Sequence, residues 1–236
     1  MFRHASNRTQ TMLTGRTAAL IAVGLLLAAV APSALAQRHT DRAGTAEFGF
    51  MVAEVDGVDV TGKHGAALSV DSDPAWGFTG GYNFTNRLFF GGEWTWASPS
   101  YVATRAPDSP PGPLNSIRAN LDVSTFIVKA QFNFFEGAVT PYAEIGGGWI
   151  YVDSNIATGP PQTGCWWDPW WGYVCTSWYD TYNDTRTGWM YGLGVRWDVS
   201  DSIVLRGLWG QTDMKTNYAS TNLKYDNYRV EVAWKF

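Results

Sequence analysis

Charged residues recur at alternate positions within apolar segments of this chain, and they are its clearest candidates for chemistry. By the two-residue period of an extended strand, they fall on the face opposite the bulky side chains. They are Glu93, Lys129, Glu144, Arg196, Arg206, Arg229, Glu231 and Lys235. In the narrow interior of a closed sheet such charges should pair, because an unpaired buried charge costs several kcal/mol. The set fits either a salt-bridged plug or a gated polar path for ions or small solutes.

The second candidate is the segment GCWWDPWWGYVC at 164–175, which carries the only two cysteines, Cys165 and Cys175. We expect a disulfide, because both lie in one predicted loop of an exported chain and no histidine lies nearby to make a metal site. Closing so short a loop contributes about 2–3 kcal/mol. Five aromatic residues stand between the cysteines: Trp166, Trp167, Trp170, Trp171 and Tyr173. They could bind a protein, glycan or membrane, or pack on a barrel rim or in the lipopolysaccharide zone, where Trp is favoured.

Residues for catalysis or nucleic-acid binding are scarce. Of the three histidines, only His64 lies where it could serve as a base, and no Ser-containing motif surrounds it. The net charge is −4, and removal of a basic leader makes the chain more acidic still, which gives no reason to expect nucleic-acid binding. We therefore expect no enzyme activity, no metal and no cofactor.

The beginning of the chain predicts export. Residues 1–16 hold Arg3, Arg8 and Arg16 and no acid, an apolar run follows at 17–31, and Ala34-Leu35-Ala36 is a small-residue cleavage pattern. This order describes a signal peptide, 1–36, cut before Gln37. The alternative, a membrane anchor, would need about 20 apolar residues.

After residue 37 the sequence predicts strands. Aromatic residues and glycine are plentiful and only 16% of residues are charged, which favours strands over helices. Period-two alternation predicts eight of them, at 46–55, 75–84, 88–97, 121–134, 141–152, 188–198, 202–211 and about 224–236. Short links after the second, fourth and sixth strands alternate with long links at about 56–74, 98–120, 153–187 and 212–223. This alternation is typical of an all-β, eight-stranded antiparallel up-and-down transmembrane β-barrel with short periplasmic turns and four longer, ragged external loops.

The bulky face is predicted to contact lipid. A soluble barrel would bury its aromatic face, but here the opposite face holds Gly77, Gly81, Gly91, Gly146, Gly148, Gly192 and Gly194. Small residues suit the lumen of eight strands, which side chains can only just fill. The aromatics gather near strand ends, as in interfacial girdles: Trp94, Trp96, Tyr151 and Trp189 at one rim, and Phe84, Phe134, Trp197 and Trp234 at the other.

The last residues, YRVEVAWKF, alternate without a lapse and end on an aromatic. Tyr228, Val230, Val232, Trp234 and Phe236 share one face. The segment resembles the C-terminal signal of bacterial outer-membrane proteins, which implies recognition by the barrel-assembly machinery. GYNFTNRLFFGGEW (81–94) and TPYAEIGGGW (140–149) resemble hairpins of small opacity-protein-like and outer-membrane-protein-A-like barrels.

The resemblance covers nearly all of 46–236 and implies a cell outer membrane location, with 37–45 as a periplasmic segment. That family includes adhesins, scaffolds and narrow channels. The resemblance implies that lipid-A-modifying members of the family need His, Ser and an acid together. It also implies that barrels of the outer-membrane-protein-W type have a more apolar lumen, so the charges here count against that type. We expect action through the external loops, in surface interaction or envelope integrity, with a small porin-like channel as the alternative. Expected partners are outer-membrane lipid, lipopolysaccharide and a host or surface ligand.

Overall fold

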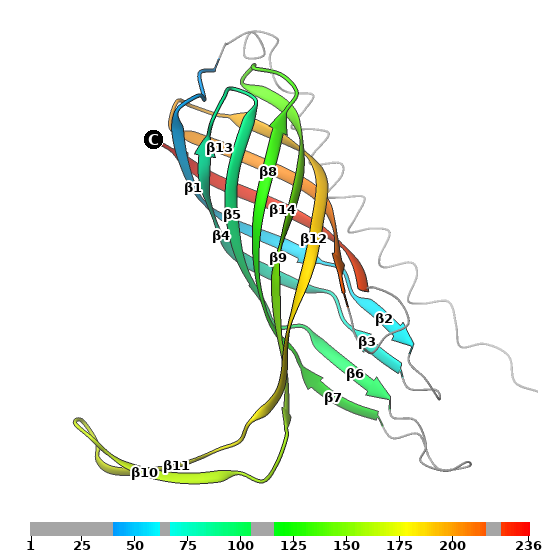
Figure 1. The fold of residues 1–236 in the computed structure, drawn as a ribbon, viewed down its shortest axis with the longest axis vertical. Coiled ribbons are helices and arrows are strands. Elements are labelled where there is room, and N and C mark those ends of the chain that lie inside the picture. The colour runs from blue at the N-terminus through cyan, green and yellow to red at the C-terminus, as the bar shows by residue number, and fades with distance from the viewer. Residues whose placement is uncertain (1–39, 62–66, 105–115, 216–222) are drawn as a thin grey trace, which may run out of the picture.

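The computed structural model describes residues 40–61, 67–104, 116–215 and 223–236, and within these ranges the chain forms strands and no helix. Eight strands close into one antiparallel barrel, as predicted (Figure 1). They are β1 (Thr45–Val55), β4 (Asp73–Asn83), β5 (Leu88–Ala97), β8 (Asp122–Asn133), β9 (Val139–Ala157), β12 (Thr181–Asp198), β13 (Ile203–Met214) and β14 (Leu223–Lys235). Each pairs with the barrel strands next to it in the sequence, and β1 with β14 closes the ring.

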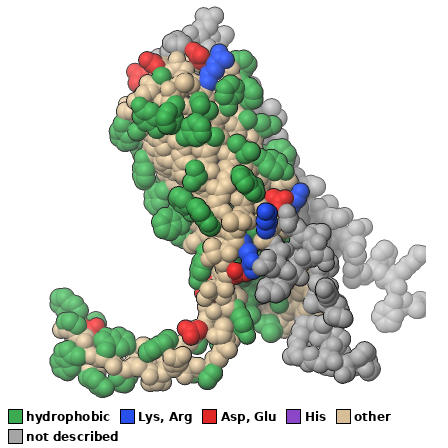
Figure 2. Space-filling view, in the orientation of Figure 1, with side chains coloured by type: hydrophobic (Ala, Val, Ile, Leu, Met, Phe, Trp, Pro, Cys, Tyr) green, Lys and Arg blue, Asp and Glu red, His purple; other side chains and the backbone are tan. Residues whose placement is uncertain are grey.

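Alternation along the strands sorts side chains between the two faces of the barrel wall. In the closing pair, Phe48 lies opposite Trp234 and Phe50 opposite Val232, and all four side chains face outward. Aromatic rings on neighbouring strands also contact one another, as at Trp76 and Trp96, whose ring centroids lie 4.8 Å apart. The space-filling view shows this outer surface covered by hydrophobic side chains (Figure 2). Such a belt suits lipid rather than water.

One end of the barrel, here called the turn end, has the short links at 84–87, 134–138 and 199–202. Side-chain hydroxyls fold two of these turns. Thr85 Oγ1 accepts a hydrogen bond from Leu88 N at 2.9 Å, and Ser200 Oγ accepts one from Ile203 N at 3.0 Å. Ser and Thr commonly stabilise tight turns in this way.

The opposite end, here called the loop end, is more regular than the sequence predicted. The long links were expected to be ragged, but two of them contain β2 (Val58–Thr61), β3 (Ala67–Val70), β6 (Ser100–Thr104) and β7 (Ser116–Asn120), which form a separate four-stranded sheet. Strands β9 and β12 also continue beyond their predicted ends, and they carry the hairpin of β10 (Gln162–Asp168) and β11 (Gly172–Trp178). The sequence does not predict these extra strands, because most of them are too short to show a two-residue period.

Asn155 lies in β9 between Asp153 and Ala157, where the pairing with β12 shifts register. Its backbone is left-handed, with φ of 54°, a conformation that Asn tolerates better than most residues. Its side-chain amide donates to Asn120 O at 3.1 Å and to Asp122 Oδ2 at 2.9 Å. In Figure 1, β9 and β12 run on together beyond this point and the β10–β11 hairpin turns to one side. These two hydrogen bonds tie this part of β9 to β7 and β8.

The core of the protein lies inside the barrel. Large buried side chains there include Met51, Phe89, Ile127, Tyr142 and Ile150. Within the described ranges, no helix is long and apolar enough to cross a membrane.

Candidate functional site

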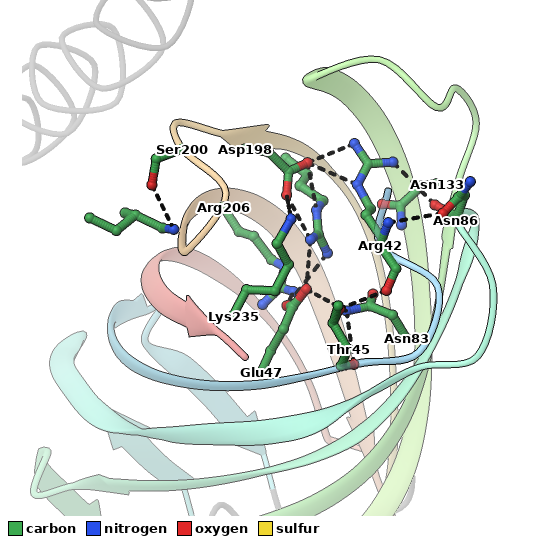
Figure 3. Close-up of polar contacts among 12 residues, drawn as sticks. Arg42, Thr45, Glu47, Asn83, Asn86, Asn133, Asp198, Ser200, Arg206 and Lys235 are labelled. Atoms are coloured by element: carbon green, nitrogen blue, oxygen red, sulfur yellow. Dashed lines mark hydrogen bonds and ion pairs between the residues drawn. The ribbon is translucent and has the colours of Figure 1, made fainter. Parts of the chain in front are cut away.

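Near the turn end, the lumen holds a network of buried charges contributed by four neighbouring strands, β1, β14, β13 and β12 (Figure 3). Arg196 Nη2 lies 2.6 Å from Glu47 Oε1 and 2.9 Å from Asp198 Oδ1. Arg206 also pairs with Glu47, and with Glu231 on the neighbouring β14. Lys235 Nζ adds a longer contact of 3.8 Å to Asp198 Oδ1. Every carboxylate in this group therefore faces at least one cation, as a buried charge requires.

A second group of charges lies across the middle of the lumen. Lys129 Nζ lies 2.7 Å from Glu93 Oε2 and 3.4 Å from Glu144 Oε2. Arg229 Nη2 lies 2.6 Å from Glu144 Oε1, and Arg229 pairs with Glu93 as well. These four side chains come from β5, β8, β9 and β14, and each is at most 5% exposed. The pairs tie four strands together across the lumen.

All eight charges singled out in the sequence thus lie buried inside the barrel. Sequence reasoning missed three further members of the network, Arg42, Glu47 and Asp198. Glu47 and Asp198 share the inward parity of Met51 and Arg196, so the same period would have found them. Arg42 precedes the first strand and has no periodic signal.

Arg42 closes the turn end of the barrel. Its guanidinium donates to Asp198 Oδ2 at 2.8 Å and to three backbone carbonyls: Asn86 at 3.1 Å, Phe135 at 3.2 Å and Gly137 at 2.5 Å. The side chain of Asn86 in turn accepts from the backbone N–H groups of Arg42 and Ala43. Burial lowers the pKa of Arg42, and the Asp198 carboxylate opposes that shift, so the guanidinium stays charged at neutral pH. One side chain therefore fastens the segment 40–44 across this end of the barrel.

The β10–β11 hairpin is the second site. Cys165 and Cys175 form a disulfide across the two strands, as the sequence predicted. At the tip, Asp168 Oδ1 accepts from Trp170 N at 2.8 Å and from Trp171 N at 3.0 Å, and Gly172 adopts the left-handed φ of 77° that completes the turn. The tip is therefore a defined structure rather than a loose loop.

The aromatic residues of the hairpin point into solvent. Their side chains are exposed by 48% at Trp166, 74% at Trp167, 88% at Trp170, 80% at Trp171 and 69% at Tyr173. In the described part of the chain, β10 and β11 pair only with each other. This exposure does not fit packing on the barrel rim; a binding surface and a place in the lipopolysaccharide zone both stay predictions.

Neither site offers a place for a metal or cofactor within the described ranges, where no group of three or more His, Cys, Asp or Glu residues could hold an ion. His64 lies outside the described residues. The charges in the lumen are already engaged with one another, so they make a structural network.

The sequence of the barrel is similar to that of a known protein family. Residues 20–236 match the family described as "Outer membrane protein beta-barrel domain". The chain belongs to this outer-membrane β-barrel family. The family is one of structural and adhesion barrels rather than of enzymes. Short turns in such barrels face the periplasm and long links face the cell exterior. The turn end is therefore the periplasmic end and the loop end is the external end.

Two of the similar solved structures, Neisserial surface protein A and OprG, have TM-scores above 0.5 and show the same fold. Neisserial surface protein A is 15% identical, with a TM-score of 0.52, and the match covers 82% of this chain and 99% of that one. OprG of Pseudomonas aeruginosa is 16% identical, with a TM-score of 0.51, covering 84% and 98%. The attachment invasion locus protein Ail of Yersinia pestis, solved with the heparin analogue sucrose octasulfate, is 13% identical, with a TM-score of 0.46, covering 82% and 99%. A search by sequence among curated proteins finds no match.

The end of the chain keeps the predicted alternation. Val230, Val232 and Trp234 face outward, and Phe236 is 76% exposed while its backbone N–H bonds Ala46 O at 2.9 Å. The role of this segment as an assembly signal stays a prediction. So does cleavage before Gln37, since residues 1–39 lie outside the described residues.

Proposed function

We propose that this outer-membrane barrel acts at the cell surface through its aromatic hairpin, while its charged network keeps the lumen closed to ions. The observation that carries the proposal is the exposure of Trp167, Trp170 and Trp171 on a disulfide-bonded hairpin that projects away from the barrel. Tryptophan is the residue type most enriched at the energetic centres of protein interfaces. A structured tip also loses little conformational entropy on binding.

The chemistry of the hairpin narrows the class of partner. Its only charged side chain between the cysteines is that of Asp168, which is occupied by the turn. An uncharged aromatic surface suits apolar patches of a protein or the faces of neutral sugars better than a strongly anionic glycan. Outer-membrane lipid and lipopolysaccharide surround the barrel, and the barrel-assembly machinery is the expected partner during insertion.

The ion pairs in the lumen support this assignment over the alternative of a small ion channel. The ion pairs at Glu93, Glu144 and Arg229 cross the interior, and Arg42 covers the periplasmic end. An ion would have to separate buried pairs to pass, and each separation leaves an uncompensated charge. We assign the lumen a structural role and the hairpin the binding role.

Replacing both tip residues, Trp170→Ala with Trp171→Ala, is expected to weaken surface binding at least about tenfold, because buried indoles commonly contribute about 2 kcal/mol or more each at interfaces. Bacteria that display equal amounts of folded protein are applied to arrays of neutral glycans, anionic glycans and matrix proteins. The matched control is Gln162→Ala with Thr176→Ala, two exposed polar positions on the same hairpin. The proposal requires a ligand that wild type and control retain and the Trp variant loses; equal retention of all three, or of none, contradicts it.

A further inference from the structure

The half of the lumen nearest the loop end is not filled by the charged network. It contains a cavity of about 610 Å³, within the range of about 300–1,000 Å³ typical of small-molecule sites. The walls combine barrel strands with the outer sheet, and they are mainly aliphatic. They include Met51, Val55, Leu121, Ile150, Met190 and Leu223.

Small side chains create this space. Ala53, Ala75 and Ala97 line the cavity from β1, β4 and β5, and Ala53 lies opposite Ala75 in the strand pairing. The short strands β2 and β3 extend the wall beyond the barrel with Val58, Leu68 and Val70. Binding in such a cavity is favoured by the apolar ligand surface that it removes from water.

The floor of the cavity is the central ion network. Glu93 and Arg229 reach it from below, but each is already paired with an opposite charge. A charged ligand group placed at the floor would have to compete with these pairs. The floor therefore favours the uncharged end of a ligand.

The mouth has the opposite character, because its charges are mostly unpaired carboxylates. Asp56, Asp71 and Asp73 line the upper part of the cavity, and among the described residues none of them forms an ion pair. The other charges there, Asp184 and Arg186, pair with each other. Burial raises the pKa of Asp56, and the nearby Asp226 raises it further, which shows that negative charge is crowded at this point.

We propose that the outer half of the lumen is a binding site for a single amphipathic cation, with its apolar chain in the cavity and its positive head group among the carboxylates at the mouth. Apolar burial supplies the affinity, and the carboxylates supply the preference for a cation over an anion. The site is independent of the hairpin. It requires no passage through the charged network, so it needs no open channel.

The test uses three probes with the same alkyl chain length and different head groups: decyltrimethylammonium, decanol and decanoate. Full-length protein purified from outer membranes is incubated with each probe, and native mass spectrometry measures how many molecules each barrel holds. Wild type is expected to bind one decyltrimethylammonium per barrel, at least about tenfold more tightly than decanoate. Replacing two of these three carboxylates, Asp56→Asn with Asp71→Asn, is expected to reduce that preference toward one. Decanol should bind with an affinity between those of the two ions.

Blocking variants locate the site. Ala53→Trp fills the cavity and is expected to reduce binding at least about tenfold, whereas Ala143→Trp, the same change on the lipid-facing side of β9, should leave it unchanged. Ala97→Trp, nearer the mouth, is the second block in case the first variant fails to fold. A preference for decanoate, equal binding of the cation and the anion, or undiminished binding in a folded blocked variant would overturn the proposal.

Discussion

Replacing Arg229 with methionine lowers the free energy of unfolding by about 3–5 kcal/mol, the usual cost of removing one partner from a buried ion pair. The size of this effect follows from the two carboxylates that Arg229 serves. Glu93 and Glu144 are each at most 5% exposed, and Lys129 alone would remain to balance both. Urea unfolding of the barrel in lipid vesicles, followed by tryptophan fluorescence and gel mobility, measures the change.

Arg87→Met is the matched control. Arg87 also pairs with a glutamate, since its Nε lies 3.0 Å from Glu136 Oε1, but both side chains are more than a third exposed. Exposed pairs of this kind contribute about 0–1 kcal/mol. If the two variants unfold at the same urea concentration, the buried network does not hold the barrel together as described.

Gly148→Ala is the second large effect, and it acts through packing rather than charge. A Cβ at this position would meet the backbone carbonyl oxygen of Phe126 and lie 2.8 Å from Ile127 Cα on the neighbouring β8. Backbone atoms cannot move aside as a side chain can, so the two strands must separate. Overpacking of this kind costs about 3 kcal/mol, and the fraction of heat-modifiable, folded barrel should fall accordingly.

Gly207→Ala separates this packing effect from the general effect of adding a methyl group to a strand. Gly207 faces outward on β13, and an added Cβ has nothing within 4 Å. Its replacement should change the stability by no more than about 0.5 kcal/mol. Similar losses at both glycines would mean that β8 and β9 are not in the close contact described.

The sequence predicted the barrel well because lipid, backbone pairing and a narrow lumen each leave a period-two signal. Alternation placed Trp94 outside and Glu93 inside without any coordinates, and short links alone fixed which strands are neighbours. The same parity extended by a few residues would have added Glu47 and Asp198 to the network.

The remaining features arise from tertiary contacts that leave no local signal. Arg42 takes its place because two turns, 84–87 and 134–138, present carbonyl groups to it. The outer sheet is built from strands such as β2 and β3, each of four residues, too short for alternation to be distinguished from chance. The charged residues predict a lumen that is not apolar, yet their side chains occupy only part of the lumen. The rest of the lumen is a cavity lined in part by small residues such as Ala53. No sequence pattern shows that such a residue faces a cavity.

Single-channel recording tests the central claim, that ion pairs close the lumen. Barrels purified from outer membranes and shown to be folded by their heat-dependent gel mobility are inserted into a planar bilayer under an applied voltage. The buried network predicts no discrete current steps above the baseline of the empty bilayer. Reproducible steps of constant size from the folded wild-type barrel would contradict it and make the lumen a conducting path.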